Sequence, residues 1–237
     1  MDAYSIPLTD EEKKTLFKAI NVGLNDFKDH FAGIHSSFDN GYGLVTWSFI
    51  YNSIYHNQTL KNGKSLKAKR GGWPLALVFH EKTGYLYAFV KKKNFLYRQK
   101  TVHRNSVVYY LQALSSFNNG AENEIPSYQL NSYQTNIDFG ICLEEKDNII
   151  EEMLGEYRDQ IKRFCVVLFD TDKNEITEFG AVLTNENLDD FYTESWNDCI
   201  EVDYKDHLNK DSNETEENDQ HDILLEFNDM EEDEETS

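Results

Sequence analysis

The chain has 237 residues, with 43 Asp and Glu residues against 23 Lys and Arg residues, so its formal net charge is −20 with histidine neutral. This charge excludes a uniformly basic nucleic-acid-binding protein and a polybasic membrane-binding protein. No apolar run approaches the ~20 residues that span a bilayer, and the N-terminal residues lack the basic and apolar regions of a signal peptide. We therefore expect a cytoplasmic protein that makes no contact with a membrane.

The first expected element is a helix that begins after Thr9. Thr9 and Glu12 have the spacing of a capping box, in which each side chain bonds the backbone N–H of the other residue. Apolar residues then recur at helical spacing as far as Gly33: Leu16, Ile20, Leu24, Phe27 and Phe31. A second run with the same period predicts another helix: Leu44, Trp47, Tyr51 and Ile54.

Two β-hairpins are predicted further along the chain. The first joins residues 75–79 to residues 85–90 through a loop that contains Gly84, and the second joins residues 165–169 to residues 175–183 through a loop that contains Asn174. Gly and Asn tolerate the left-handed backbone conformation better than other residues, so both loops are expected to turn alike. A constant offset of 90 residues aligns the two hairpins.

Helices are expected around both hairpins, at residues 107–117, 149–161 and 187–196, with a polar linker at 118–136. The whole predicts an α+β domain over residues 1–200, in which an antiparallel sheet made from the two hairpins packs with helices. A duplicated α-β-β-α unit, with halves 1–118 and 137–200, is an alternative to two independent hairpins.

The charge is distributed very unevenly. Residues 61–104 contain twelve basic residues and only one acidic residue, which gives a local charge of +11. The predicted basic patch consists of Lys64, Lys67, Lys69, Arg70, Lys91, Lys92, Lys93, Arg98, Lys100 and Arg104. Aromatic residues lie between them: Tyr85, Tyr87, Phe89, Phe95 and Tyr97. Cations beside aromatic faces are typical of single-strand nucleic-acid binding, whereas alternation along a strand equally predicts that the aromatic residues belong to the core.

Residues 201–237 carry two basic and sixteen acidic residues, a local charge of −14, and are expected to form a disordered acidic tail. One apolar cluster interrupts this tail: Ile223, Leu224, Leu225 and Phe227. Such a cluster is typical of a segment that folds on binding a partner, although the tail also fits a purely solubilising role. Its charge further suggests that the tail masks the basic patch in the same chain.

No motif identifies an enzyme. Cys142, Cys165 and Cys199 are widely spaced, which argues against a disulfide framework or a zinc site. The sequence contains no H-E-x-x-H, G-x-S-x-G, Walker or G-x-G-x-x-G motif. We expect no metal, no cofactor and no catalytic residue, and an enzyme whose site is assembled from distant residues ranks third among the function classes.

Several stretches together resemble a family of small bacterial proteins of unknown function. They are the stretch that begins Ser5 to Lys13 and runs through Ile20-Asn21, then Gly41-Tyr42-Gly43, Trp47, and Lys69-Arg70-Gly71-Gly72-Trp73 leading into the first hairpin. The resemblance covers about residues 5–200 and implies a bacterial or phage setting. It implies no activity and no site residue.

The favoured function is that of a non-enzymatic regulatory or inhibitory protein, such as an antitoxin, an immunity protein or a phage-defence inhibitor. Its acidic surfaces and tail would bind a basic protein partner, because an acidic surface can occupy the cationic site of a nuclease. The alternative is an RNA-binding or DNA-binding protein that uses residues 61–104. Neither the partner nor the oligomeric state follows from the sequence.

Overall fold

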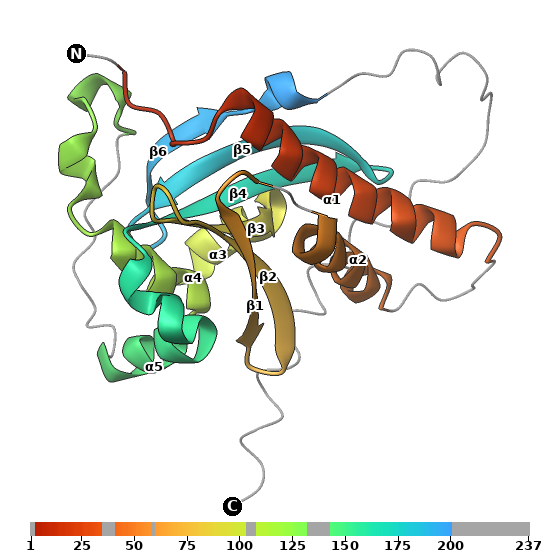
Figure 1. Cartoon of the computed structure of the whole chain (residues 1–237), viewed down its shortest axis with the longest axis horizontal. Coiled ribbons are helices and arrows are strands. Elements are labelled where there is room, and N and C mark those ends of the chain that lie inside the picture. The colour runs from red at the N-terminus through yellow and green to blue at the C-terminus, as the bar shows by residue number, and fades with distance from the viewer. Residues whose placement is uncertain (1–2, 35–40, 58–59, 103–107, 132–142, 201–237) are drawn as a thin grey trace, which may run out of the picture.

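A computed structural model describes residues 3–34, 41–57, 60–102, 108–131 and 143–200 of the chain (Figure 1). Its centre is one six-stranded sheet with strand order β1-β2-β3-β4-β5-β6. Adjacent strands are antiparallel except β3 and β4, which are parallel. The strands are β1 (Gly63–Arg70), β2 (Trp73–His80), β3 (Tyr85–Lys91), β4 (Arg163–Asp172), β5 (Glu175–Thr184) and β6 (Asp190–Ser195). The α+β fold with a largely antiparallel sheet is therefore confirmed.

Helices cover both faces of this sheet. Figure 1 shows α1 (Asp10–Phe31) and α2 (Tyr42–Asn57) on one face, and α3 (Lys92–Thr101), α4 (Tyr110–Ser115) and α5 (Leu143–Leu154) on the other. Side chains of β3 alternate between two cores, so that Tyr87 packs beneath α1 and α2 and Leu86 packs against α3, α4 and α5. None of the helices in the described ranges is long and apolar enough to cross a membrane.

The capping box predicted at Thr9 begins α1. The Glu12 amide donates to Thr9 Oγ1 over 3.2 Å, and the Thr9 amide donates to Glu12 Oε2 over 2.9 Å. Midway along this helix, Gly23 faces α2 so closely that a Cβ atom would lie 2.6 Å from the Cα of Ile50. Glycine at position 23 therefore lets the two helices pack backbone to backbone over β3, β4 and β5.

Both predicted hairpins are present, as β2–β3 and β4–β5. Gly84 and Asn174 have φ values of +77° and +65°, so the two loops do share a left-handed residue at the aligned position. The residues that flank the hairpins differ from the prediction. Each hairpin is extended to a three-stranded meander, by β1 before the first and by β6 after the second.

The helix predicted at 187–196 was wrong, because this segment is a turn followed by β6. The side chain of Asn185 accepts from the amides of Asn187 and Asp189 over 2.9 and 3.0 Å, which fixes a turn after β5. Leu188 then takes a φ of +62°, a conformation that no helix contains. The second hairpin consequently lacks the closing helix of an α-β-β-α unit.

The connection between β3 and β4 carries the remaining helices. The predicted helix at 149–161 begins earlier, at Leu143, and gives way after Leu154 to the 3₁₀ segment η5 (Gly155–Gln160). Within the predicted polar linker, residues 118–131 contain short 3₁₀ turns. The parallel pairing of β3 with β4 joins the expected halves 1–118 and 137–200 in one sheet. The acidic tail at 201–237 lies outside the described residues.

Candidate functional site

The predicted basic patch is divided between two parts of the fold. Four of its residues belong to β1, at one edge of the sheet: Lys64, Lys67, Lys69 and Arg70. Five others belong to the end of β3 and to α3: Lys91, Lys92, Lys93, Arg98 and Lys100. Arg104 lies outside the described residues. The lysines of β1 and those of α3 therefore do not form one continuous stripe along neighbouring strands.

Several of these cations are held by neighbouring side chains. Arg70 donates to the Tyr109 hydroxyl over 3.0 Å, and the guanidinium of the buried Arg98 lies 4.4 Å from the centre of the Tyr109 ring. Lys92 forms an ion pair with Glu178, over 2.5 Å, and Lys64 donates to the Tyr157 hydroxyl. Arg70 of β1 and Arg98 of α3 thus meet at Tyr109.

The interleaved aromatic residues are mostly core residues. Tyr85, Tyr87, Phe89 and Phe95 are all buried, whereas Tyr97 is 37% exposed. Tyr85, Tyr87 and Phe89 share the face of β3 beneath α1 and α2, as the alternation along the strand predicts. Only Tyr97 of these five residues is exposed, so the other four rings cannot supply the stacking surface that a single-strand binder uses.

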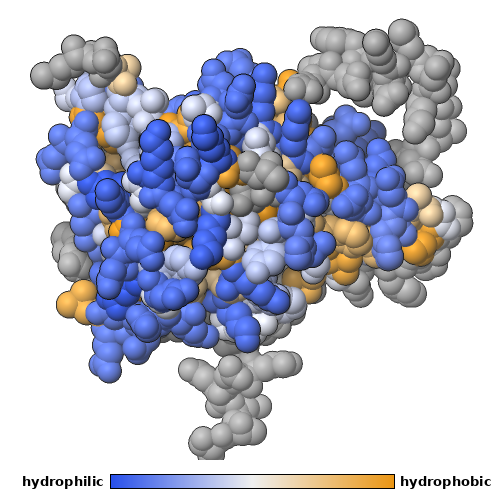
Figure 2. Space-filling model, viewed as in Figure 1, coloured by the Kyte–Doolittle hydropathy of each residue, from blue (hydrophilic) through white to orange (hydrophobic). Residues whose placement is uncertain are grey.

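The outward side of α5 and η5 is rich in acidic side chains. Six exposed carboxylates lie there: Glu144, Asp147, Glu151, Glu152, Glu156 and Asp159. Arg158 lies 2.8 Å from Asp147 and 3.7 Å from Glu151. Ile150, Met153 and Leu154 on the opposite side are buried in the core. Figure 2 shows this part of the visible face as hydrophilic. We call these six carboxylates the acidic face of α5.

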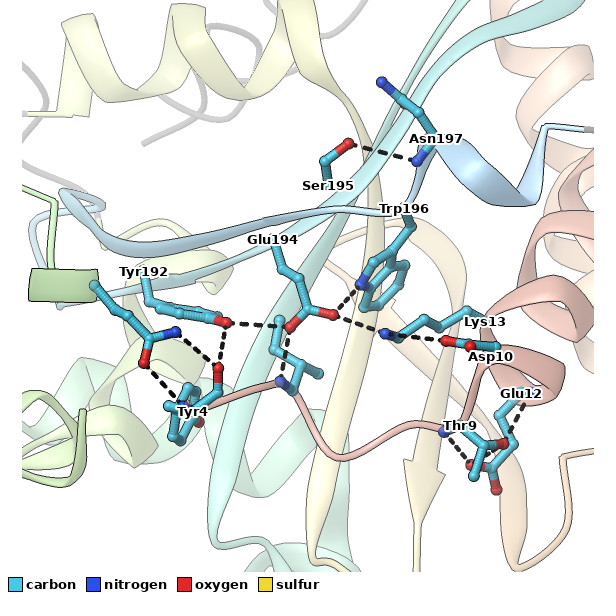
Figure 3. Close-up of polar contacts among 12 residues, drawn as sticks. Tyr4, Thr9, Asp10, Glu12, Lys13, Tyr192, Glu194, Ser195, Trp196 and Asn197 are labelled. Carbon is cyan, nitrogen blue, oxygen red and sulfur yellow. Dashed lines mark hydrogen bonds and ion pairs between the residues drawn. The ribbon is translucent and has the colours of Figure 1, made fainter. Parts of the chain in front are cut away.

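A cluster of polar side chains holds the N-terminal segment against β6 (Figure 3). Glu194 is at its centre and accepts hydrogen bonds from the Ile6 amide over 2.8 Å, from Lys13 Nζ over 2.8 Å and from Trp196 Nε1 over 2.8 Å. Burial by itself would raise the pKa of Glu194, but these hydrogen bonds outweigh it and lower the pKa below its usual value. A carboxylate with this many donors is suited to anchoring the chain.

Tyr4 extends this N-terminal polar cluster. Its amide donates to Gln129 Oε1 over 2.9 Å, and its carbonyl accepts from Gln129 Nε2 over 3.0 Å and from the Tyr192 hydroxyl over 2.9 Å. Its own hydroxyl lies 2.6 Å from that of Tyr85. Burial strongly raises the pKa values of Tyr4 and Tyr192, so both phenols stay protonated at neutral pH. The cluster therefore combines one carboxylate, Glu194, with one cation, Lys13, and with neutral hydrogen-bond donors.

No local motif could have revealed this cluster. Tyr4 and Tyr192, like Ile6 and Glu194, are 188 positions apart in the chain.

Neither buried cysteine is poised as a nucleophile, because burial raises the pKa values of Cys165 and Cys199. Within the described ranges, no three His, Cys, Asp or Glu side chains are grouped closely enough to hold a metal ion.

The hydroxyl of Tyr87 is buried beneath α1 and has no hydrogen-bond partner among the residues that the structure describes. An unsatisfied buried hydroxyl costs about 1–3 kcal/mol. We expect Tyr87→Phe to leave the free energy of unfolding unchanged or to raise it by about 1 kcal/mol. Tyr85→Phe, which removes the hydrogen bond to Tyr4, is the matched control and should lower it by about 1 kcal/mol. Urea denaturation measures the free energy of unfolding of both variants. A larger loss of stability in Tyr87→Phe than in Tyr85→Phe would show that the Tyr87 hydroxyl has a partner.

Comparison with known proteins gives one match. A search of the curated proteins and a search of the solved structures found no significant match. The model of a family of unknown function, DUF5986, matches residues 5–237, which is nearly the whole chain. The chain therefore belongs to this family of unknown function.

Proposed function

We propose that this protein is a non-enzymatic regulatory protein that binds a basic protein partner through the acidic face of α5. The observation that carries the proposal is the concentration of six exposed carboxylates within residues 144–159. Most of these carboxylates lie on α5, which buried apolar side chains anchor to the sheet, and two lie on η5, whose partly buried Tyr157 packs against the same core. Their charges are therefore fixed relative to one another before a partner arrives, which reduces the entropy lost on binding.

Electrostatic complementarity explains how such a surface would act. A fixed group of carboxylates attracts a cationic surface over about one Debye length, roughly 8–10 Å at physiological salt, and raises the rate of association. The cationic groove of a nuclease or another nucleic-acid-binding protein is a suitable target, because its substrate is a polyanion. An antitoxin, an immunity protein or a phage-defence inhibitor in the bacterial cytoplasm would act in this manner.

Nucleic-acid binding through residues 61–104 is the second candidate. It is supported by the exposure of Lys67, Lys69, Lys93 and Lys100, and by the meeting of Arg70 and Arg98 at Tyr109. The burial of Tyr85, Tyr87, Phe89 and Phe95 weighs against it, since these rings cannot stack on bases. It ranks below the acidic face for that reason.

The test reverses charges on the acidic face of α5 in the full chain. The variant carries Glu144→Lys, Glu152→Lys and Glu156→Lys. The control carries Glu11→Lys, Asp26→Lys and Asp29→Lys on the exposed side of α1, which changes the net charge equally. Tagged wild-type protein is used to isolate a partner from its native cells, and the partner is then purified and titrated against all three proteins.

We expect a basic partner whose Kd rises about 100-fold for the α5 variant, at roughly 1 kcal/mol per reversed contact, and changes less than about threefold for the α1 control. The affinity of the wild-type protein should fall as salt is added. Equal binding by both variants, or isolation of nucleic acid that also binds the purified protein, contradicts the proposal.

A further inference from the structure

The N-terminal residues 3–8, which we call the strap, are held against the sheet by side chains. Gln129 bonds both backbone groups of Tyr4, since its Oε1 accepts from the amide over 2.9 Å and its Nε2 donates to the carbonyl over 3.0 Å. The Glu194 carboxylate accepts from the Ile6 amide over 2.8 Å, and Figure 3 shows the strap running alongside β6 with Glu194 pointing toward it. Among the described residues, no backbone hydrogen bond joins the strap to a strand, so the strap is not part of the sheet.

Alternate side chains of the strap enter the core. Ile6 and Leu8 are 0% and 7% exposed and lie in the core beneath α1 and α2, whereas Ser5 is exposed. Tyr4 is half-buried, and its ring packs edge-to-face on that of Tyr192, with the ring centres 4.9 Å apart. A period of two is that of an extended peptide. The site therefore accepts an extended segment with one aromatic and two aliphatic side chains at alternate positions.

The hydrogen bonds of this site do not depend on the sequence of the strap. Gln129, Tyr192 and Glu194 bond backbone groups, which any extended segment offers. Backbone bonds of this kind supply affinity in peptide recognition, and the places for alternate side chains supply specificity. The charge of Glu194 is balanced by Lys13 at 2.8 Å, so the site requires no charge from its occupant, and the strap has none. These are the features of a peptide-binding site that the chain's own strap fills.

We propose that the site filled by the strap binds an extended segment of a partner protein, and that the strap is an autoinhibitory occupant which must leave first. The partner segment is uncharged and carries an aromatic and two aliphatic residues at alternate positions, as Tyr4, Ile6 and Leu8 do. A segment held without a backbone ladder opens locally more readily than the core strands. The apparent Kd of the partner equals its intrinsic Kd divided by the fraction of molecules with an open strap. This proposal does not depend on the acidic face of α5.

Binding of a synthetic peptide to the full chain tests the proposal. The probe is a fluorescent peptide with the sequence of residues 3–9, and its affinity is measured by fluorescence anisotropy. The variant Ile6→Asp places a charge at a buried position and releases the strap, while the control Ser5→Asp adds the same charge at an exposed position. We expect the probe to bind Ile6→Asp at least about tenfold more tightly than wild type or the control. Equal affinity for all three proteins, or no binding to folded Ile6→Asp, overturns the proposal.

Hydrogen exchange in the wild-type chain tests displacement directly, and it remains decisive if Ile6→Asp fails to fold. A saturating amount of the unlabelled probe should make the Ile6 amide exchange at least about tenfold faster, while the Leu86 amide in the core keeps its rate. Binding of the probe without this change at Ile6 shows that the peptide binds elsewhere and refutes the proposal. Light scattering identifies the occupant, and we expect a monomer at every concentration. A dimer that Ile6→Asp abolishes would show that the strap of a second copy fills the site, which also refutes the proposal.

Discussion

Asn118→Ala is expected to lower the free energy of unfolding by about 3–5 kcal/mol. The Asn118 side chain is buried between the ends of β4 and β5. Its Nδ2 donates to the carbonyls of Phe164 and Thr184 over 2.8 and 2.9 Å, and its Oδ1 accepts from the Phe164 amide over 2.9 Å. Alanine would leave three backbone groups buried without partners, each at a cost of about 1–3 kcal/mol.

The neighbouring Asn119→Ala is the control for that substitution. Asn119 is exposed and donates only to Glu186 Oε1, over 2.9 Å, so its loss should cost less than about 1 kcal/mol. Urea denaturation of both variants at pH 7 measures the difference. If the two substitutions were equally mild, the junction between η2 (Ser116–Asn118) and the β4–β5 pair would contribute little to folding.

Local sequence patterns predicted the elements that have a strong period and a clear boundary. The capping box at Thr9 and the apolar repeat to Phe31 define α1, and Gly84 and Asn174 mark the turns of both hairpins. The segments missed were those in which tertiary contacts override composition. Residues 63–70 are rich in lysine, which suggested a charged surface, yet alternate Leu66 and Ala68 bury one side of an edge strand.

At residues 187–196 a helix was predicted where the structure has a strand. Its polar and aromatic residues permitted an interpretation as a helix, but the Asn185 turn and the antiparallel pairing of Tyr192 with Leu183 make it a strand. Asn118 shows the same limitation, because a polar residue at the start of a predicted linker gives no sign that it is buried. Pairing partners 66 positions apart, such as Asn118 and Thr184, leave no pattern in a local window.

The candidate sites also differ in whether the sequence alone reveals them. The acidity of residues 144–159 and the basic charge of residues 61–104 are visible in the sequence, because charge is a property of composition. The N-terminal polar cluster is not visible, since it depends on folding that brings Tyr4 and Lys13 to Glu194 and Trp196. The tail residues Ile223, Leu224, Leu225 and Phe227 lie outside the described residues, and their role remains a proposal.

Glu194→Gln is expected to lower the free energy of unfolding by about 2–3 kcal/mol at pH 7. The side chain of Glu194 is 15% exposed and that of Lys13 is 14% exposed, so their 2.8 Å ion pair is shielded from solvent. Glutamine has one acceptor oxygen, which can face either Ile6 or the pair of Lys13 and Trp196 but not both. The substitution therefore leaves at least one buried donor unsatisfied and Lys13 without its principal counter-charge.

The pH dependence of stability provides an independent readout of the same group. The folded protein lowers the pKa of Glu194 below its ordinary value of 4.5, so folding favours the charged carboxylate. The stabilisation that Glu194 supplies is accordingly complete above about pH 4.5, the value in the unfolded chain, and is lost as the pH falls through the lower value of the folded state. Wild-type protein should approach the stability of Glu194→Gln as the pH falls towards 3, because protonation neutralises the carboxylate as the amide does.

Glu178→Gln is the control for both readouts. Glu178 lies on the adjacent strand β5 and pairs with Lys92, but its side chain is 48% exposed, so we expect a loss below about 1 kcal/mol. Urea denaturation of the three proteins at intervals from pH 7 to pH 3 gives the free energy of unfolding of each protein as a function of pH. If the difference between wild type and Glu194→Gln persisted undiminished at low pH, the charge of Glu194 would contribute nothing, and the cluster would act through hydrogen-bond geometry alone.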